Sequence, residues 1–181
     1  MCDETTEREL DEYLKRKPVT RRGFTIGATA TLAATGLVIP ACATPPDPDT
    51  ITETAVSINT PDGTADGLFI HPVAGAHAAV IIWPDIHGVR PAFFDMARSL
   101  AGEGYSVLAM NPYYRTHVGR LFEEGQTIRD EGGWALVEPH YSSLSPDTVI
   151  TDTGALVAWL DTQAAVDTSR GIGAVGFCMT G

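Results

Sequence analysis

The chain contains no lysine after Lys17, so most of it has few positive charges. Residues 1–22 carry six acidic and six basic side chains, which cancel, and the formal net charge of −11 therefore belongs to the residues that follow. An acidic surface without basic clusters disfavours nucleic acids and anionic membranes as partners. We therefore expect no nucleic-acid partner for this protein.

Cysteine is also scarce, because the 181 residues hold only Cys2, Cys42 and Cys178. Their positions fit neither the close spacing of a zinc site nor a framework of disulfide bonds. The sequence implies no metal ion and no organic cofactor. Each cysteine must therefore be interpreted from its own surroundings.

A long apolar run is missing as well. The uncharged stretch 26–39 is short for a membrane-spanning helix and rich in Ala, Thr and Gly. It follows Arg21 and Arg22, and this pair with Phe24 resembles a twin-arginine export signal. We therefore expect residues 1–42 to engage the twin-arginine export machinery, which makes the protein periplasmic or extracellular. A short N-terminal anchoring helix is the alternative.

The end of this signal suggests a second feature. Pro40, Ala41 and Cys42 resemble the processing site of a lipoprotein, in which the cysteine carries the lipid. A lipid on Cys42 would anchor the protein, and we expect contact with a membrane only in that case. Residues 43–50 are rich in proline and predict a linker, so the globular domain is expected to span residues 51–181.

The start of this domain has the pattern of a β-hairpin. Residues 52–58 and 65–71 alternate between apolar and polar side chains, as half-buried strands do. The segment 59–63 between them contains Pro, Asp and Gly, which are residues of tight turns. We therefore expect two antiparallel strands joined at this turn.

Two continuous apolar runs follow, at residues 78–83 and 105–110. Such runs are typical of parallel strands that are buried on both faces by helices. Between them, apolar residues at helical spacing begin after Pro91 and stop at Gly102, which predicts a helix. Strand, helix and strand form a βαβ unit with a right-handed crossover.

The stretch 111–145 has few apolar residues at regular spacing, and the sequence assigns no element to it. Ser145 and Pro146 then predict the start of a helix that reaches about Ala165. Apolar residues within 172–175 predict a last buried strand. The predicted fold class is therefore α/β, with a mostly parallel sheet, helices on both faces and an N-terminal hairpin.

The last strand stops abruptly at the segment Gly176–Gly181. A nucleophile held on a sharp turn between a strand and a helix needs small neighbours, and Gly176 stands two positions before Cys178. A cysteine there can attack an acyl carbon as a thiolate, and the backbone N–H of Met179 can receive the resulting oxyanion. A buried cysteine followed by an ordinary glycine turn is the alternative.

This segment, Gly-Phe-Cys-Met-Thr-Gly, resembles the nucleophile turn of the dienelactone hydrolase family, which are α/β-hydrolases with Cys in place of Ser. The family motif more often has Gly where this chain has Thr180. The resemblance covers residues 51–181 and implies the N-terminal part of an α/β-hydrolase fold. It also implies a small-molecule substrate, an enol-lactone or a related carboxylic ester, that is cleaved through an acyl-enzyme on Cys178.

Three strand ends are expected to meet, because sites in open α/β sheets form at the carboxyl ends of the strands. They are Asp85 with Ile86, the segment that ends at Arg115, and Cys178. In the α/β-hydrolase plan the loop after the third strand supplies the second oxyanion N–H, which pairs Ile86 with Met179. The resemblance implies that Asp85 is a partner of Cys178 and that Arg115 binds a substrate carboxylate. The alternatives are a loop or capping acid at Asp85 and a solvated arginine at Arg115.

His87 follows Ile86, and its imidazole is a candidate general base. We expect it instead to line the site or to be an exposed loop residue. In this fold the triad acid and His follow the nucleophile along the chain. Cys178 is three residues from the end of the sequence. We therefore expect the 181-residue chain to be the incomplete N-terminal part of an enzyme and to be inactive alone.

Three functions remain open at this point. The first is an exported hydrolase of the dienelactone hydrolase type. The second is a general exported esterase with the same fold, which substrate profiling would distinguish from the first. The third is a non-catalytic surface lipoprotein that keeps the fold without the chemistry, and an Asp and a His at later strand ends would argue against it.

Overall fold

The expected hairpin consists of β1 (Ile51–Thr60) and β2 (Gly63–Pro72), which pair antiparallel. Thr60 pairs with Gly63, so the turn contains only two residues, as its Pro-Asp sequence favours. The structure is a computed structural model and describes residues 50–181. The expected export signal, the lipid site at Cys42 and the linker up to residue 49 lie outside the described residues.

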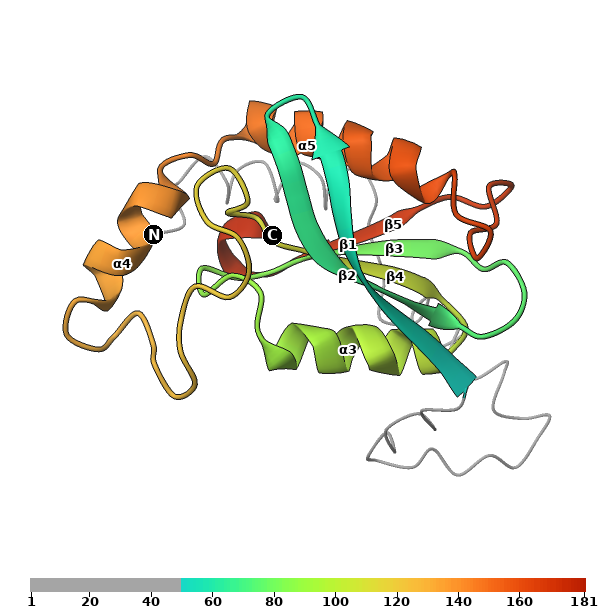
Figure 1. Ribbon diagram of the computed structural model, residues 1–181, viewed down its shortest axis with the longest axis horizontal. Coiled ribbons are helices and arrows are strands. Elements are labelled where there is room, and N and C mark those ends of the chain that lie inside the picture. The colour runs from blue at the N-terminus through green and yellow to red at the C-terminus, as the bar shows by residue number, and fades with distance from the viewer. Residues whose placement is uncertain (1–49) are drawn as a thin grey trace, which may run out of the picture. The chain divides into compact units, whose positions relative to one another are not determined.

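The sheet has five strands in the order β1-β2-β4-β3-β5. β3 (Ala79–Trp83) lies between β4 (Ser106–Met110) and β5 (Gly173–Gly176) and is parallel to both. The pairs β1–β2 and β2–β4 are antiparallel. The fold class is therefore the expected α/β, with a mixed sheet that is parallel in its core (Figure 1).

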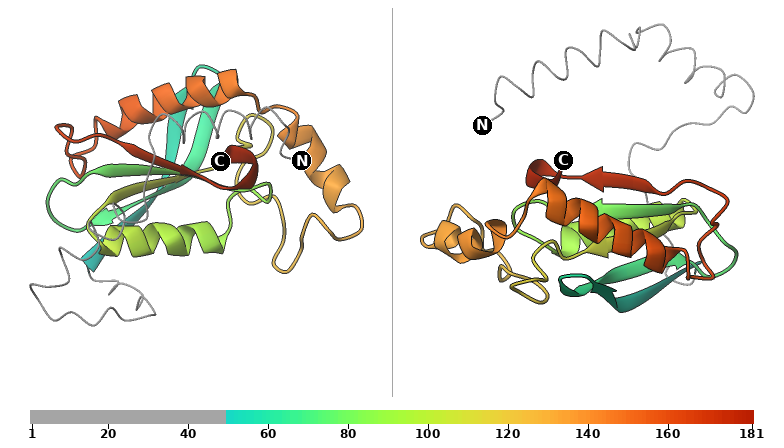
Figure 2. Two further views of the ribbon diagram at one scale, coloured as in Figure 1. Left: turned by 180° about the vertical axis from the view of Figure 1, so that it is seen from behind. Right: turned by 90° about the horizontal axis from the view of Figure 1, so that it is seen from above.

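Two helices cover the opposite faces of this sheet (Figures 1 and 2). α3 (Pro91–Gly102) connects β3 to β4 and has the expected proline at its start. α5 (Pro146–Leu160) precedes β5, and Ser145 and Thr148 cap its first turn by reciprocal hydrogen bonds. Within residues 50–181 no helix is both long and apolar enough to cross a membrane.

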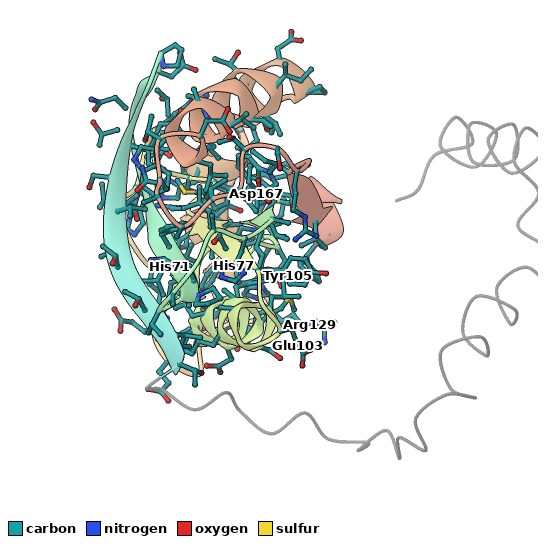
Figure 3. All side chains as sticks on the ribbon, turned by 90° about the vertical axis from the view of Figure 1, so that its right-hand side faces the viewer. His71, His77, Glu103, Tyr105, Arg129 and Asp167 are labelled. Atoms are coloured by element: carbon teal, nitrogen blue, oxygen red, sulfur yellow. The ribbon has the colours of Figure 1, made fainter. Side chains whose placement is uncertain are left out.

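The central strands are apolar throughout because successive side chains point to opposite faces, and both faces are covered. Ile81 and Leu108 belong to the cluster that packs against α5, which contributes Leu156. Ile82 belongs to the other cluster, together with Phe93 of α3. Side chains fill both layers between the sheet and the helices (Figure 3). The two layers hold the carboxyl ends of the strands in a fixed arrangement.

α5 ends at Leu160, whereas the sequence predicts a helix that reaches about Ala165. The Ala165 carbonyl accepts hydrogen bonds from the His77 N–H at 2.9 Å and from the buried Ser106 hydroxyl at 2.6 Å. The Asp167 N–H then donates to the His77 carbonyl at 2.8 Å, and the two residues lie close together (Figure 3). These tertiary bonds replace the last helical turn and direct the chain into β5.

The stretch to which the sequence assigned no element contains a helix, α4 (Gly133–Tyr141). Its first residue is tightly packed, since a Cβ on Gly133 would lie 2.5 Å from the Thr127 carbonyl oxygen. The helix also contains Pro139. The buried Val137 packs in an apolar cluster with residues outside the helix, so tertiary contacts rather than a regular apolar stripe stabilise α4.

Candidate active site

Cys178 has a backbone conformation that L-residues rarely adopt. β5 ends at Gly176, Phe177 is extended, and a single turn of 3₁₀-helix, η2 (Cys178–Thr180), begins at the cysteine. The φ of Cys178 is 59°, and it is the one non-glycine residue with positive φ within residues 50–181. Such a conformation costs on the order of 1–3 kcal/mol and persists only where the surroundings impose it. The exposed thiol is therefore presented on the sharp turn that the sequence predicted.

Gly176 makes this turn sterically feasible. A Cβ at position 176 would lie 1.9 Å from the Thr180 carbonyl oxygen and 2.5 Å from its carbonyl carbon. No side chain fits at that distance from a backbone group. The structure therefore confirms that a small residue is needed two positions before Cys178, and the close contact at this position leaves room only for glycine.

Thr180, which stands where the family motif more often has Gly, is accommodated through its hydroxyl group. Its Oγ1 accepts the Phe177 N–H at 2.9 Å. It also lies 2.8 Å from the Trp83 carbonyl and 3.0 Å from the Pro84 carbonyl, either of which can take its single proton. Thr180 therefore ties the cysteine turn to the end of β3.

The predicted strand ends do meet at one edge of the sheet. Tyr113, which follows β4, donates a hydrogen bond from its hydroxyl to the Ile86 carbonyl at 2.8 Å. The same hydroxyl lies 3.4 Å from the Met179 sulfur. The ends of β3, β4 and β5 are thus joined through one side chain, and Ile86 and Met179 lie on either side of it.

The N–H groups of Ile86 and Met179 are available for a ligand. Neither donates a hydrogen bond to another of the residues 50–181. Backbone N–H groups in a folded protein are normally paired, and two such groups beside a nucleophile are the basis of an oxyanion hole. The role of these two N–H groups as an oxyanion hole stays a prediction.

The model of the dienelactone hydrolase family matches residues 65–181 of this chain. The chain belongs to the dienelactone hydrolase family. A protein of Synechocystis sp. named as a candidate carboxymethylenebutenolidase is 32% identical to it over 133 residues. That match covers 72% of this chain and 51% of the relative, so the chain spans about half the length of the curated relative.

Solved structures of dienelactone hydrolases and related proteins share the fold. A candidate dienelactone hydrolase from Klebsiella pneumoniae superposes with a TM-score of 0.57 at 21% identity, over 72% of this chain and 51% of that chain. A dienelactone hydrolase-like promiscuous phosphotriesterase from metagenomic libraries superposes with a TM-score of 0.56 at 20% identity and the same coverage. These likenesses show that the chain shares the fold of these proteins.

Asp85 is held within its own loop in this dienelactone hydrolase family member. Its carboxylate lies 2.6 Å from Nη2 of Arg90 and accepts the His87 N–H at 3.0 Å. Burial acts to raise the pKa of Asp85, but the bonds from Arg90 and His87 together outweigh burial and hold the pKa below its usual value. Asp85 makes no hydrogen bond to Cys178 in the described part of the chain, so their partnership stays a prediction.

His87 directly follows Ile86, and one of its ring nitrogens already accepts a hydrogen bond. Its Nε2 accepts the Ile128 N–H at 3.2 Å, and its ring lies against Phe122 with the centroids 5.1 Å apart. Its Nδ1 lies 3.4 Å from a carboxylate oxygen of Asp85. A nitrogen that already accepts a backbone N–H is poorly placed to take a proton from the thiol, which favours the site-lining role over the role of a base.

Arg115 has contacts that do not support the expected role in binding a substrate carboxylate. Its guanidinium donates to both carboxylate oxygens of Asp152, at 2.8 and 2.9 Å, and also to Asp62. The side chain is only 11% exposed, so it is not a solvated loop arginine either. Arg115 joins the hairpin turn, the segment after β4 and α5, and its role in binding a substrate carboxylate stays a prediction.

The sequence did not predict the apolar wall, a cluster of side chains that packs against Ile86 and Met179. Both side chains pack against an apolar cluster of Tyr113, Leu121, Phe122 and Val137, all from the stretch 111–145. No periodic pattern marks these residues, because they come from an irregular segment and a short helix. The only sequence signal was the position of Tyr113 at a strand end.

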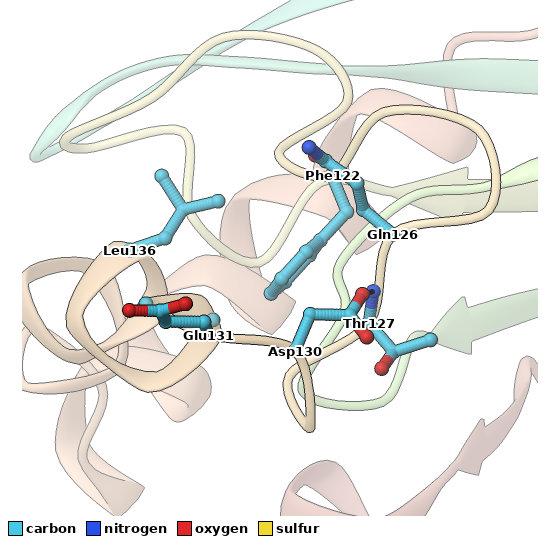
Figure 4. A pocket seen from close by; sticks show the side chains of 8 residues that line it. Phe122, Gln126, Thr127, Asp130, Glu131 and Leu136 are labelled. Carbon is cyan, nitrogen blue, oxygen red and sulfur yellow. Dashed lines mark hydrogen bonds between the residues drawn. The ribbon is translucent and has the colours of Figure 1, made fainter.

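Two hollows lie near this wall. One of about 450 Å³ borders the cysteine turn and is lined by Met179, Thr180 and Gly181 together with residues around the start of α5. A smaller one of about 130 Å³ surrounds Phe122 and includes Asp130, but none of the predicted site residues (Figure 4). Among residues 50–181, no group of three or more His, Cys, Asp or Glu side chains is arranged to hold a metal ion.

The steric role of Gly176 leads to a stability prediction. Gly176→Ala should lower the free energy of unfolding by more than about 2 kcal/mol, because its methyl group meets backbone atoms that cannot rotate away. Gly154→Ala is the matched control, since a Cβ there meets open space within α5, and it should raise stability by about 0.5–1 kcal/mol. Chemical denaturation of both variants measures the two effects. Equal stabilities would contradict the steric argument.

Proposed function

We propose that this member of the dienelactone hydrolase family hydrolyses a small carboxylic ester, with an enol-lactone as one substrate class, through an acyl-enzyme on Cys178. The observation that carries the proposal is the strained Cys178, with a φ of 59°, followed directly by the unpaired N–H of Met179. The unpaired N–H of Ile86 belongs to the loop that Tyr113 links to Met179. A structural cysteine needs no such conformation. Strain of this kind is typical of residues whose function depends on presentation.

The proposed reaction has two steps. In the first, the Cys178 thiolate attacks the acyl carbon, the carbonyl oxygen becomes negative between the N–H groups of Ile86 and Met179, and the C–O bond then breaks. In the second, a base takes one proton from water, the resulting hydroxide attacks the thioester, and the C–S bond breaks to release the acid and the thiolate. A base takes the thiol proton and returns it to the leaving oxygen. Within residues 50–181 no side chain is hydrogen-bonded to the Cys178 sulfur for this purpose.

A general esterase is the second candidate, and the contacts of Arg115 favour it. The sequence-based assignment to a lactone that carries a carboxylate depended on this arginine as the anionic-substrate site. In the structure two carboxylates already neutralise Arg115, so it offers no free positive charge. Neutral esters need no such charge.

We also propose that residues 1–42 export the protein through the twin-arginine route, to the periplasm or the outside. The supporting feature is Arg21-Arg22 ahead of an uncharged stretch. Membrane association would follow only from a lipid on Cys42.

The first prediction concerns the nucleophile. In the whole protein, Cys178→Ala should lower kcat/KM for an aryl ester by at least about 10³-fold, because it removes the covalent route. Cys178→Ser should retain part of the activity, since it keeps the turn with a poorer nucleophile. Cys42→Ala is the control and should leave kcat/KM unchanged. Full activity of Cys178→Ala would exclude the acyl-enzyme and favour a non-catalytic role.

The second prediction separates the two substrate classes. Because Arg115 is structural, Arg115→Lys should change KM for a carboxylated lactone and for a neutral ester by the same factor, within about two-fold. Steady-state kinetics with both substrates measure this ratio. A KM that rises about ten-fold for the carboxylated substrate alone would restore Arg115 as a binding residue, since a charge-assisted hydrogen bond contributes about 1.5–3 kcal/mol.

The third prediction concerns export. Replacement of Arg21 and Arg22 by lysine should leave the precursor in the cytoplasm, because the paired arginines are what the machinery reads. Cell fractionation with an antibody against the globular domain measures this. Unchanged export of the double variant would exclude the twin-arginine route.

A further inference from the structure

Two hydroxyl groups bridge the gap between the loop after β3 and the cysteine turn. The first belongs to Tyr113, whose side chain is fully buried and whose hydroxyl contacts both Ile86 and Met179. The second belongs to Thr180, which links the turn to the carbonyls of Trp83 and Pro84. Each hydroxyl therefore connects the two segments that carry the candidate oxyanion N–H groups.

Tyr113 fixes the loop that carries Ile86. Its hydroxyl proton on the Ile86 carbonyl orients the peptide that follows Ile86, and its ring packs on the same loop at Gly88. A Cβ on Gly88, whose φ is 70°, would lie 3.2 Å from that ring. Burial, with the negative charge of Asp85 nearby, raises the pKa of Tyr113. The phenol is therefore protonated, and a donor, at neutral pH.

Thr180 fixes the segment that carries Met179. Its Oγ1 accepts the Phe177 N–H, which also points toward the Trp83 carbonyl at 3.2 Å. Met179 lies between Phe177 and Thr180 in the chain. The direction of the Met179 N–H therefore depends on the hydrogen bond between these two residues. A glycine at position 180 would lack the hydroxyl and leave the turn tied to β3 by backbone contacts alone.

We propose that Tyr113 and Thr180 are positioning residues that set the distance and orientation between the Ile86 and Met179 N–H groups, and thereby complete the oxyanion hole. The proposal rests on the function proposed above. Donors stabilise an oxyanion only when they lie about 2.7–3.1 Å from it, and displacements near 1 Å cost about 100-fold in rate. Neither side chain touches the reacting atoms, so both act through Ile86 and Met179.

The test removes each hydroxyl without changing the shape of the side chain. Tyr113→Phe and Thr180→Val delete the two hydroxyls, and Thr180→Ser restores one of them. Tyr105→Phe is the control, because Tyr105 is 37% exposed and directly precedes β4, whereas Tyr113 follows the other end of that strand. All variants are made in the whole protein, and aryl ester hydrolysis is measured.

Two rates distinguish positioning from a general structural effect. Hydrolysis forms an oxyanion, whereas alkylation of Cys178 by iodoacetamide forms the S–C bond as iodide leaves and creates no oxyanion. Tyr113→Phe and Thr180→Val should each lower kcat about 10–100-fold with KM changed less than about three-fold, while the alkylation rate stays within about two-fold of wild type. Thr180→Ser should recover most of the lost kcat, and Tyr105→Phe should match the wild type.

Several outcomes overturn the proposal. Wild-type kcat in both hydroxyl-deleted variants would show that the hydroxyls do not set the hole. A parallel loss of hydrolysis and alkylation, or no recovery in Thr180→Ser, would show that they support the turn in general. These failures are distinct from failure of the proposed function, which would appear as undiminished hydrolysis by Cys178→Ala.

Discussion

The close contact between Gly176 and the carbonyl group of Thr180 is the constraint from which the site follows. It allows the chain to reverse within a few residues after β5, and the reversal places Cys178 in the left-handed region. The strain, on the order of 1–3 kcal/mol, is offset by the bonds that hold both sides of the turn to β3. An exposed thiol on a rigid turn follows directly from this backbone geometry.

The rest of the fold supplies the surroundings of that turn. Because β3 pairs in parallel with β4 and β5, the carboxyl ends of the three strands lie at one edge of the sheet. α3 and α5 pack on opposite faces of the sheet and hold these strands in place (Figure 1). The irregular stretch 111–145 adds the apolar wall around Tyr113, against which Ile86 and Met179 pack. Two layers of regular structure and one irregular segment thus define the candidate oxyanion hole.

The sequence predicted those parts of the fold that depend on local patterns: the hairpin, the βαβ unit and the glycine-dependent turn. It could not predict α4, whose buried Val137 packs in a cluster with Tyr113 far back along the chain, or the early end of α5, where Ala165 bonds to His77 and Ser106. The ion pairs of Arg115 could not be predicted either. Its partners, Asp62 and Asp152, are 53 and 37 residues away in sequence, and nothing local indicates that they meet.

Detection of the acyl-enzyme tests the mechanism most directly. The whole protein is mixed with a neutral aryl ester and quenched in acid within the first turnover. It is then digested, and the mass of the peptide that contains Cys178 is measured by mass spectrometry. A thioester at Cys178 predicts a peptide heavier by the mass of the acyl group, formed at the rate of the initial burst. Turnover with an unmodified Cys178 peptide, or with the acyl group on another residue, would contradict the assignment of Cys178 as the nucleophile.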